Sequence, residues 1–594
     1  SSNTVSMKEF FKYTLATLTG IILSGVIFFI LIFSILIGSL ISSTDQKVVL
    51  KDTSVLSLKL EGVLNERVVD NPLKELLDIN QSSLGLKDIL EAIDKAKVNP
   101  NIKGIYLEAG SMSTSFASLE AIRKALLDFK DSGKFIVAYA DQYSQGLYYV
   151  ASVADQVHLN PKGGLAWAGL SAQPMFYTDL FKKAGVDMQI FKVGTYKSAV
   201  EPYTETKMSA ANREQMTVFL QDIWSHILGG VSESRGISTE RLNDLANQMM
   251  LFQPTEEVMS NNLVDKLSYR YEVKDAVRNL IGEDSEPDYV SYKKMKNVSA
   301  PEKEKTKSEG SIAVYYAEGG IVDQGSKYDT EIVGNTVVKD LKKLEENSRV
   351  KAVVLRVNSP GGSAYASEQI WKAVQDLKAK KPVVVSMGDY AASGGYYISA
   401  GADWIVAEPT TLTGSIGIFA MIPSFEKLAD KVGLSFDVVK TNKFADFGSI
   451  FRGFNADERM LLQRYIEDGY DLFVKRCADG REMANDSIRQ IAEGRVWTGT
   501  RALKLGLVDQ LGGLDEAVAV AAQKAGISSY RLRSYPQEKS FLDKLLEMSG
   551  QDLVQTYLAK GKLKEVYQQV ESVNQLMSDS FLQARMPYIL HFNQ

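Results

Sequence analysis

The stretch "VKAVVLRVNSPGGSAYASEQIWKAVQDLKAKKPVVVSMGDYAASGGYYISAGADWIVAEP", residues 350–409, holds the pattern that predicts the fold. Three apolar runs, "VKAVVLRV", "KPVVVSM" and "WIVAEP", are separated by the helical stretch "ASEQIWKAVQDL" and by a second helix that carries glycine and tyrosine. Strands that alternate with helices of about 10–15 residues are typical of parallel βαβ units. The stretch therefore predicts an α/β domain built on a parallel sheet.

The same pattern occurs a second time, earlier in the chain. Residue 103 pairs with residue 351, and a constant offset of 248 continues to about residue 197 without a gap. Between residues 103–170 and 351–418, 19 of the 68 paired positions are identical. Because self-similarity at a fixed period indicates a repeated structural unit, we predict two copies of one α/β domain in tandem.

The repeat divides the 594 residues into five segments. We expect an N-terminal repeat over 47–292 and a C-terminal repeat over 311–540, preceded by a segment over 1–46 and followed by a tail over 541–594. Between the repeats, "KKMKNVSAPEKEKTKSEG" (293–310) has nine charged residues in 18 and no aromatic residue, which indicates a solvated linker. The tail has helical periodicity, so we predict a helical packing or oligomer-contact segment; binding to a membrane surface is the alternative.

The N-terminal segment has the pattern of a membrane anchor. No charged residue occurs from Tyr13 to Thr44, a run of 32 residues, and about 20 apolar residues span a bilayer. Lys8 and Lys12 precede the run and Asp45 follows it, so the positive-inside rule places the N-terminus in the cytoplasm and the rest outside. A cleaved signal peptide is the alternative, but its apolar core is shorter. We predict an uncleaved transmembrane helix.

Composition excludes several function classes. A net charge of −5 gives no support for a nucleic-acid partner. The single cysteine, Cys477, excludes an intrachain disulfide and a cysteine-based metal cluster. Only three histidines are present, so a serine nucleophile in this chain has few histidine bases to use.

The candidate nucleophile is Ser393, in "AASGG" directly after an apolar run. Its counterpart in the first repeat is Gln145, which is not a nucleophile. Ser415, in "TLTGSIG", has Trp167 as its counterpart. The second repeat therefore carries the special hydroxyl groups and the first repeat has lost them.

The candidate base shows the opposite distribution. In "FKVGTYKSAVEPY" (191–203) of the first repeat, Lys197 stands where the second repeat has Ala445. Two degenerate copies that complement each other predict one composite site between them. A lysine activates a serine only as the neutral amine, so its pKa of about 10.4 must fall by burial. We expect Ser415 to hydrogen-bond that amine and orient it.

Glycines near the serine predict an oxyanion-binding site. The loop "NSPGGS" (358–363) aligns with "GSMSTS" in the first repeat, so Gly361 and Gly362 belong to the second repeat alone. Glycine lets backbone amides approach a ligand closely, and two such donors form an oxyanion hole. We assign these donors to Gly394 and to Gly361 or Gly362.

Four motifs, "LRVNSPGGSAYASE", "GDYAASGGYYIS", "TLTGSIGIF" and "YKSAVEP", together resemble the bacterial signal peptide peptidase A (protease IV) family in its long, duplicated form. The resemblance covers roughly residues 50–540. It implies a ClpP/crotonase-like fold for each half and a serine–lysine dyad shared between the halves. The implied roles are Ser393 as nucleophile, Lys197 as general base, Ser415 as the hydroxyl that orients the lysine, and the Gly394 and Gly362 amides as oxyanion donors.

The resemblance also implies a function. Members of the family are membrane-anchored serine endopeptidases that degrade cleaved signal peptides and similar apolar peptides through an acyl-enzyme, without metal or cofactor. The long form implies a homotetramer in the inner (cytoplasmic) membrane, with one pass per chain, a cytoplasmic N-terminus and periplasmic catalytic domains.

Two other functions fit parts of the pattern. A crotonase-like acyl-CoA hydratase or isomerase also uses paired glycine amides, to bind a thioester enolate. A catalytically inactive membrane scaffold would keep the repeats and the anchor. The complementary placement of Ser393 and Lys197 argues against both, because neither alternative requires it.

Overall fold

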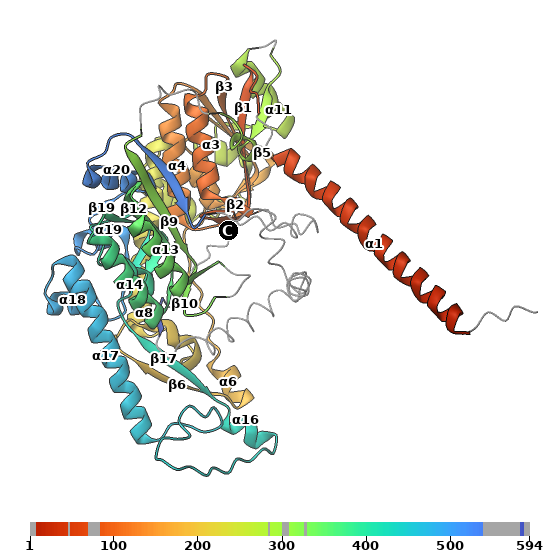
Figure 1. Cartoon of the computed structure of the whole chain (residues 1–594). Coiled ribbons are helices and arrows are strands. Elements are labelled where there is room, and N and C mark those ends of the chain that lie inside the picture. Colours follow the sequence, from red (N-terminus) through yellow and green to blue (C-terminus); the bar gives the residue numbers. More distant parts are fainter. Residues whose placement is uncertain are drawn as a thin grey trace, which may run out of the picture.

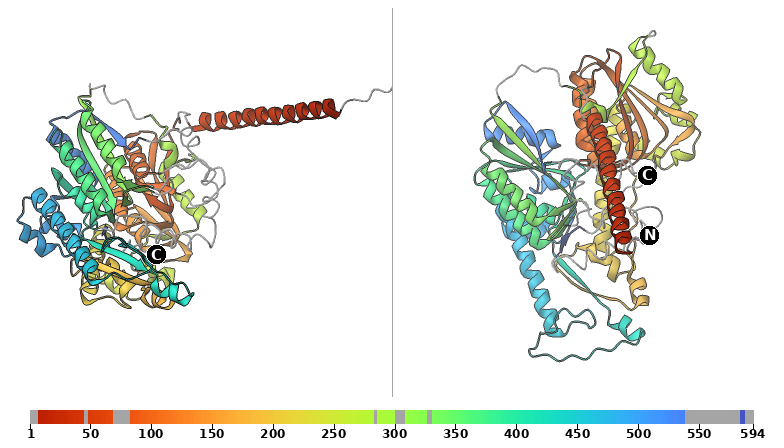
Figure 2. Two further views of the ribbon diagram at one scale, coloured as in Figure 1. Left: turned by 60° about the horizontal axis from the view of Figure 1, so that its bottom comes forward. Right: turned by 45° about the vertical axis from the view of Figure 1, so that its right-hand side comes forward.

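A computed structural model describes residues 7–44, 48–68, 83–282, 285–299, 308–325, 330–537 and 583–586. Residues 300–307 of the predicted linker and nearly all of the predicted tail lie outside these residues. Figure 1 shows the whole chain, and Figure 2 shows the first repeat, in orange to yellow, beside the second, in green to blue.

The first repeat forms a seven-stranded parallel sheet in the order β2-β1-β3-β4-β5-β7, with β8 also paired to β1. Its strands are β1 (Ser54–Asn65), β2 (Ser83–Gly85), β3 (Ile102–Ser113), β4 (Phe135–Tyr143), β5 (Gln156–Leu165), β7 (Lys266–Leu267) and β8 (Asp288–Ser291). Helices α3 (Leu86–Val98), α4 (Phe116–Lys130) and α5 (Gln145–Ala151) connect successive strands. The first halves of β3 and β4 are mostly buried, as expected where helices cover a parallel sheet.

The second repeat forms an eight-stranded sheet in the order β18-β16-β14-β12-β9-β20, with β15 also paired to β14 and β19 paired to β15. Its strands are β9 (Gly310–Glu318), β12 (Val350–Ser359), β14 (Val383–Ala392), β15 (Trp404–Ala407), β16 (Leu412–Gly414), β18 (Val496–Thr498), β19 (Gln510–Leu511) and β20 (Tyr530–Tyr535). All pairs are parallel except β16 with β18. Helices α13 (Gly334–Glu346), α14 (Ala364–Lys378) and α15 (Gly394–Ser399) connect the strands.

The predicted duplication is confirmed in three dimensions. Helices α3 and α13 begin and end 248 residues apart, and so do α4 and α14. Later in each repeat, α8 (Ala210–Arg235) and α17 (Ala456–Arg481) are both 26 residues long. The repeated unit is therefore longer than the stretch in which identities align. The tyrosines that recur at the same positions of both repeats pack in the core, and all are at most 2% exposed: Tyr148, Tyr149, Tyr396 and Tyr397.

A third sheet joins the two repeats and has the order β11-β10-β13-β21-β17-β6. Its strands are β6 (Asp187–Lys192), β10 (Gly320–Val322), β11 (Glu331–Val333), β13 (Gly361–Ser363), β17 (Phe419–Ser424) and β21 (Gln583–Arg585). Strand β6 belongs to the first repeat and pairs antiparallel with β17 of the second, at the lower end of the molecule in Figure 1. Strand β21 comes from the tail predicted to be helical, whose few described residues are extended.

Helix α1 (Met7–Thr44) precedes the first repeat and projects away from the rest of the chain (Figures 1 and 2). Among the residues that the structure describes, no helix combines the length and the apolarity that crossing a membrane requires. The anchor over residues 1–46 stays a prediction.

A buried ion pair also connects the repeats. The guanidinium of Arg356, on β12, donates to both carboxylate oxygens of Glu66 at 3.0 and 2.9 Å, and both side chains are 4% exposed. The backbone amide of Glu66 donates to Glu318 at 2.9 Å. Burial, together with the Glu66 charge, raises the pKa of Glu318 to about 7. The positive charge of Arg356 therefore compensates negative charge in the buried carboxyl group formed by Glu66 and Glu318.

We expect Arg356→Met to lower the free energy of unfolding by roughly 3–5 kcal/mol, because removing one partner leaves a buried charge uncompensated. Urea unfolding at neutral pH measures the loss. The matched control is Lys59→Met, since Lys59 pairs with Glu61 on the surface, where the two side chains are 60% and 49% exposed. Exposed pairs contribute about 0–1 kcal/mol. Equal losses for the two variants would contradict the structural role of the Arg356 pair.

Candidate active site

Ser393 lies at a sharp turn between the end of β14 and the start of α15. Its φ and ψ are 56° and −113°, a left-handed φ that is strained for a residue other than glycine and that clusters at functional sites. Its amide donates to the carbonyl of Gly414 at 2.8 Å. The residue is fully buried. The turn therefore holds the hydroxyl in one place at the junction of the repeats.

Lys197 reaches Ser393 from the first repeat. After β6 pairs with β17, the chain continues to Lys197, whose Nζ lies 2.7 Å from Ser393 Oγ. The amide of Tyr196 donates to the Glu493 carbonyl at 2.9 Å, which ties this segment to the second repeat. Gly494 has a φ of 76°, and a methyl group there would lie 2.7 Å from Lys197 Cβ. Position 494 therefore requires glycine, because the backbone of Lys197 passes directly beside it.

The surroundings of the lysine favour its neutral form. Lys197 is fully buried, and this burial lowers its pKa well below the usual value. Nζ also lies 3.0 Å from the Ser415 carbonyl oxygen and 3.1 Å from Ser415 Oγ. A neutral amine has two N–H donors and one lone pair. The two Ser415 oxygens accept the N–H groups, and the lone pair then faces the Ser393 hydroxyl.

The corresponding position in the first repeat is occupied by other side chains. Gln145 Oε1 accepts hydrogen bonds from the amides of Ala168 and Gly169 at 3.0 and 2.9 Å. Trp167, the counterpart of Ser415, is fully buried and donates to the Leu242 carbonyl at 2.8 Å. At the positions of Ser393 and Ser415, the first repeat therefore has side chains with a structural role.

The structure separates the two glycines of the "SPGG" loop. Gly361 has a φ of 96°, and a methyl group on it would lie 2.7 Å from the Gly394 amide nitrogen. A methyl group on Gly362 would instead lie 2.0 Å from the Ile321 carbonyl oxygen on β10. Gly361 is therefore the loop glycine next to Gly394. Its amide donates to Ser359 Oγ at 3.1 Å, a contact that sequence reasoning missed.

Strand β21 lies across these glycines. It pairs antiparallel with β13, with Gly361 opposite Arg585 and Gly362 opposite Ala584. A methyl group would lie 2.1 Å from the Ala584 carbonyl oxygen if built on Gly361, and 3.1 Å if built on Gly394. An extended segment of polypeptide thus places a carbonyl group against the predicted oxyanion donors. Nothing in the helical periodicity of the tail indicated this.

Two family models match parts of this chain. The model of Peptidase family S49 matches residues 128–282 and 375–528, once in each repeat. The chain belongs to peptidase family S49. A Clp protease model also matches, over residues 307–407 of this S49 peptidase, so the fold is the ClpP-like α/β fold in two repeats.

Relatives of this S49 peptidase are similar over most of their length. Protease 4 of Haemophilus influenzae is 36% identical over 510 residues, which cover 82% of this chain and 81% of the relative. Protease 4 of Salmonella typhi is 38% identical over 474 residues, 78% and 76% of the two chains. The chloroplastic serine protease SPPA of Arabidopsis thaliana is 33% identical over 480 residues, 80% and 69%. The chain is therefore a serine peptidase.

The buried neutral lysine couples stability to pH. In the unfolded chain a lysine has a pKa of about 10.4, and in the folded chain the pKa of Lys197 is well below that value. Between the two values unfolding takes up one proton, so stability falls as the pH falls, by about 1.4 kcal/mol per pH unit. We expect Lys197→Met to remove this slope and to be more stable than wild type at pH 8.

Urea unfolding at pH 8, 8.5 and 9 measures the slope. Lys192→Met is the matched control, because Lys192 is an exposed lysine on the same strand, β6, and its variant keeps the wild-type slope. A wild-type slope in Lys197→Met would show that the buried lysine is charged.

Proposed function

We propose that this S49 peptidase is a membrane-anchored endopeptidase that uses a Ser393–Lys197 dyad to degrade cleaved signal peptides and similar apolar peptides. The observation that carries the proposal is the 2.7 Å separation of Lys197 Nζ and Ser393 Oγ, with both residues fully buried. A hydroxyl and a neutral amine at this distance are a nucleophile and its base.

The reaction begins when Lys197 takes the Ser393 proton and Oγ attacks the scissile carbonyl carbon. Negative charge develops on the carbonyl oxygen next to the amides of Gly394 and the "SPGG" loop, and each such donor contributes roughly 2.7–4 kcal/mol. The Lys197 ammonium then gives its proton to the leaving amine, and an acyl-enzyme remains. Lys197 next takes a proton from water, whose oxygen attacks the ester and releases Ser393. No step requires a metal or a cofactor.

Ser415 keeps the amine in position throughout this cycle. Its carbonyl and hydroxyl oxygens accept the two N–H groups of Lys197, so the lone pair remains directed at Ser393. When Lys197 carries the extra proton, the same oxygens stabilise the ammonium in a site from which water is excluded. Ser415 is thus the orienting residue of the dyad.

The place of β21 supports an extended mode of substrate binding. Strand β13 offers backbone groups to β21, and β21 also pairs with β17 at Phe419 and Gln583. Addition of a strand to such an edge gives affinity through main-chain bonds that do not depend on sequence. An apolar peptide binds in place of β21 with its scissile carbonyl near Gly361 and Gly394. The tail segment leaves when the peptide enters.

The uncharged run over residues 13–44 supports the membrane anchor, the cytoplasmic N-terminus and the periplasmic location of both repeats. A membrane-tethered enzyme of this kind meets apolar peptides left in the membrane after secretion. The resemblance to the long form supports a homotetramer, and the net charge gives no basis for a nucleic-acid partner. Membership of family S49 disfavours the acyl-CoA alternative, and a site with serine, lysine and glycines together disfavours an inactive scaffold.

We expect Lys197→Ala to lower kcat/KM for an apolar, signal-peptide-like substrate by at least about 10³-fold. Removal of one member of a catalytic unit costs about as much activity as removal of the whole unit. The variant is compared with wild type and with Lys192→Ala, a surface control on the same strand, at matched folding. Labelling of Ser393 by an acylating serine probe falls in parallel. Near-wild-type turnover of Lys197→Ala would rule out this lysine as the base.

We expect Ala584→Trp to lower KM for the same peptide with kcat unchanged. Ala584 is fully buried, so an indole there displaces β21 and frees the edge of β13. Leu532→Trp, at a position 55% exposed on β20, is the control for the added indole. An unchanged KM in Ala584→Trp would show that β21 does not occupy the substrate groove.

A further inference from the structure

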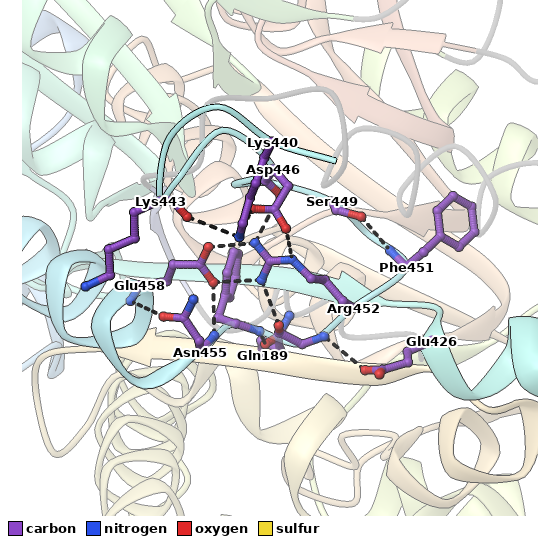
Figure 3. Close-up of polar contacts among 12 residues, drawn as sticks. Gln189, Glu426, Lys440, Lys443, Asp446, Ser449, Phe451, Arg452, Asn455 and Glu458 are labelled. Atoms are coloured by element: carbon purple, nitrogen blue, oxygen red, sulfur yellow. Dashed lines mark hydrogen bonds and ion pairs between the residues drawn. The ribbon is translucent and has the colours of Figure 1, made fainter. Parts of the chain in front are cut away.

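The segment that carries Lys197 belongs to the first repeat but lies on the second, and polar contacts hold its start. Gln189, on β6, is 9% exposed, and its Oε1 accepts the backbone amide hydrogen of Phe454 at 2.7 Å. Figure 3 shows Gln189 beside Arg452 and Glu458, whose ion pair at 2.6 Å holds the neighbouring loop of the second repeat. The start of the segment is therefore fixed by the second repeat.

Arg495 of the second repeat holds the other end of the segment, next to Lys197. The carbon of its guanidinium lies 4.6 Å from the centre of the Tyr196 ring and 4.5 Å from the centre of the Trp497 ring. Its Nη1 also donates to the Tyr196 hydroxyl at 3.1 Å. A guanidinium is planar and stacks on aromatic faces, whereas an ammonium is a compact point charge. The arginine therefore contacts two aromatic rings, one from each repeat, through its flat group.

The main chain of Arg495 holds the residue on the other side of the lysine amine. The Arg495 carbonyl accepts the amide hydrogen of Ser415 at 2.7 Å. Ser415 has a φ of 51°, a left-handed value that persists only where surrounding contacts determine it. The two Ser415 oxygens in turn accept the N–H groups of Lys197. One residue thus holds both Tyr196, next to the lysine, and the serine that orients its amine.

Gln215 of α8 supports the same contact from the first repeat. It is 2% exposed, and its Nε2 donates to the Tyr196 carbonyl and to Ser198 Oγ, both at 3.0 Å. These two residues stand on either side of Lys197. The Gln215 Oε1 accepts the amide hydrogen of Val496, the first residue of β18, at 3.1 Å. One amide side chain therefore joins both neighbours of the lysine to the second repeat.

Gln215 occurs only in the repeat that supplies the lysine. Helices α8 and α17 are both 26 residues long and begin 246 residues apart, so the counterpart of Gln215 is Leu461, which is 41% exposed. The counterpart of Lys197 is Ala445. The amide and the lysine are thus present together in one repeat and absent together from the other, as expected of groups that act together.

The charged side chains around the segment are screened or paired. Glu214 of α8 accepts from Arg495 Nη2 at 2.8 Å and is 52% exposed, and Glu493 is exposed as well, so solvent screens both charges. Glu201 is buried, and its carboxylate accepts hydrogen bonds from side chains at the start of α8. Burial is therefore what lowers the pKa of Lys197.

We propose that Arg495 is a positioning residue for Lys197. Its side chain holds Tyr196 and its carbonyl holds Ser415. The amine thereby stays in register with the Ser393 hydroxyl and away from water. Arg495 acts through these two neighbours and is not itself a catalytic residue. This role rests on the proposed function, in which Lys197 is the base.

Loss of the Arg495 side chain affects the base in two ways. Displacement of a reacting group by about 1 Å costs about 10²-fold in rate. Water that reaches the amine stabilises the ammonium, so the pKa of Lys197 rises towards the usual value. Neither effect acts on peptide binding, so kcat falls while KM is unchanged.

Steady-state kinetics of the full-length chain test the role. Arg495→Ala is expected to lower kcat about 10²-fold, with KM unchanged, and to move the rising limb of kcat/KM to higher pH. Arg495→Lys keeps the charge without the planar group, and it is expected to show the same changes. A wild-type pH profile in Arg495→Ala would overturn the proposal.

Arg501→Ala is the matched control. Arg501, on α19 (Gly499–Lys504), pairs with Asp222 of α8, so it also joins the two repeats through an arginine and a carboxylate. Asp222 lies seven residues beyond Gln215, about 10 Å further along the helix. Arg501→Ala is expected to keep the wild-type kcat and pH profile. The same changes in Arg501→Ala as in Arg495→Ala would overturn the proposal, because any contact between the repeats would then have this effect.

Acetylation of the Lys197 amine gives a readout that does not depend on activity. Wild type and Arg495→Ala are treated with acetic anhydride, and peptide mass spectrometry compares Lys197 with Lys192, which is exposed and serves as the internal reference. We expect Lys197 to be protected in wild type and acetylated several-fold faster in Arg495→Ala. Unchanged protection would overturn the proposal. Faster acetylation with wild-type turnover would instead overturn the proposed function, and this role with it, because the displaced amine would not be the base.

Tyr196→Leu tests the same stack from the first repeat and leaves Arg495 in place. It is expected to lower kcat and to expose Lys197 to acetylation as Arg495→Ala does. The double variant is expected to show no larger effect than either single variant, because substitutions in one contact are not additive. Fully additive losses would overturn the proposal, since the two residues would then act separately.

Discussion

The exclusion of water from one lysine is the constraint on which this structure depends. In the proposed mechanism Lys197 serves as a base only while its amine is neutral, and burial is what lowers its pKa. Neither repeat buries the amine alone, because the lysine follows a strand of the first repeat and its oxygen partners belong to the second. The pairing of β6 with β17 and the close approach of Gly494 are therefore conditions for the chemistry as well as features of the fold.

The strained backbone of Ser393 belongs to the same constraint. A serine at a φ of 56° is stable only where the surrounding structure determines its conformation. Here a strand ends and a helix begins at this residue, and the Gly414 carbonyl accepts its amide hydrogen. The second repeat fixes the proposed nucleophile, and the proposed base comes to it from the first repeat. The second repeat holds Ser393 and the first repeat supplies Lys197. This division explains why the first repeat could lose its own serine and glycines without losing its fold.

Much of this arrangement was predictable from the sequence, because its signals are local or repeated. Apolar runs predicted three of the strands in the sheet of each repeat, and the constant offset exposed the complementary losses at residues 145 and 445. What was not predictable depends on partners distant in the sequence. Residues 187–192 and 435–440 occupy the same repeat position, yet only the first forms a strand, because only the first has β17 beside it. The helical periodicity of the tail likewise gave no sign of β21, whose conformation comes from its pairing with β13.

Covalent fusion of the two repeats has a kinetic consequence. When the base and the nucleophile come from separate chains, the population of complete sites falls on dilution. In this chain both groups lie on one polypeptide, so assembly of the dyad is unimolecular and the effective concentration of lysine at the serine is independent of the enzyme concentration. A single molecule that meets a peptide therefore already holds a whole site, at whatever abundance the cell maintains.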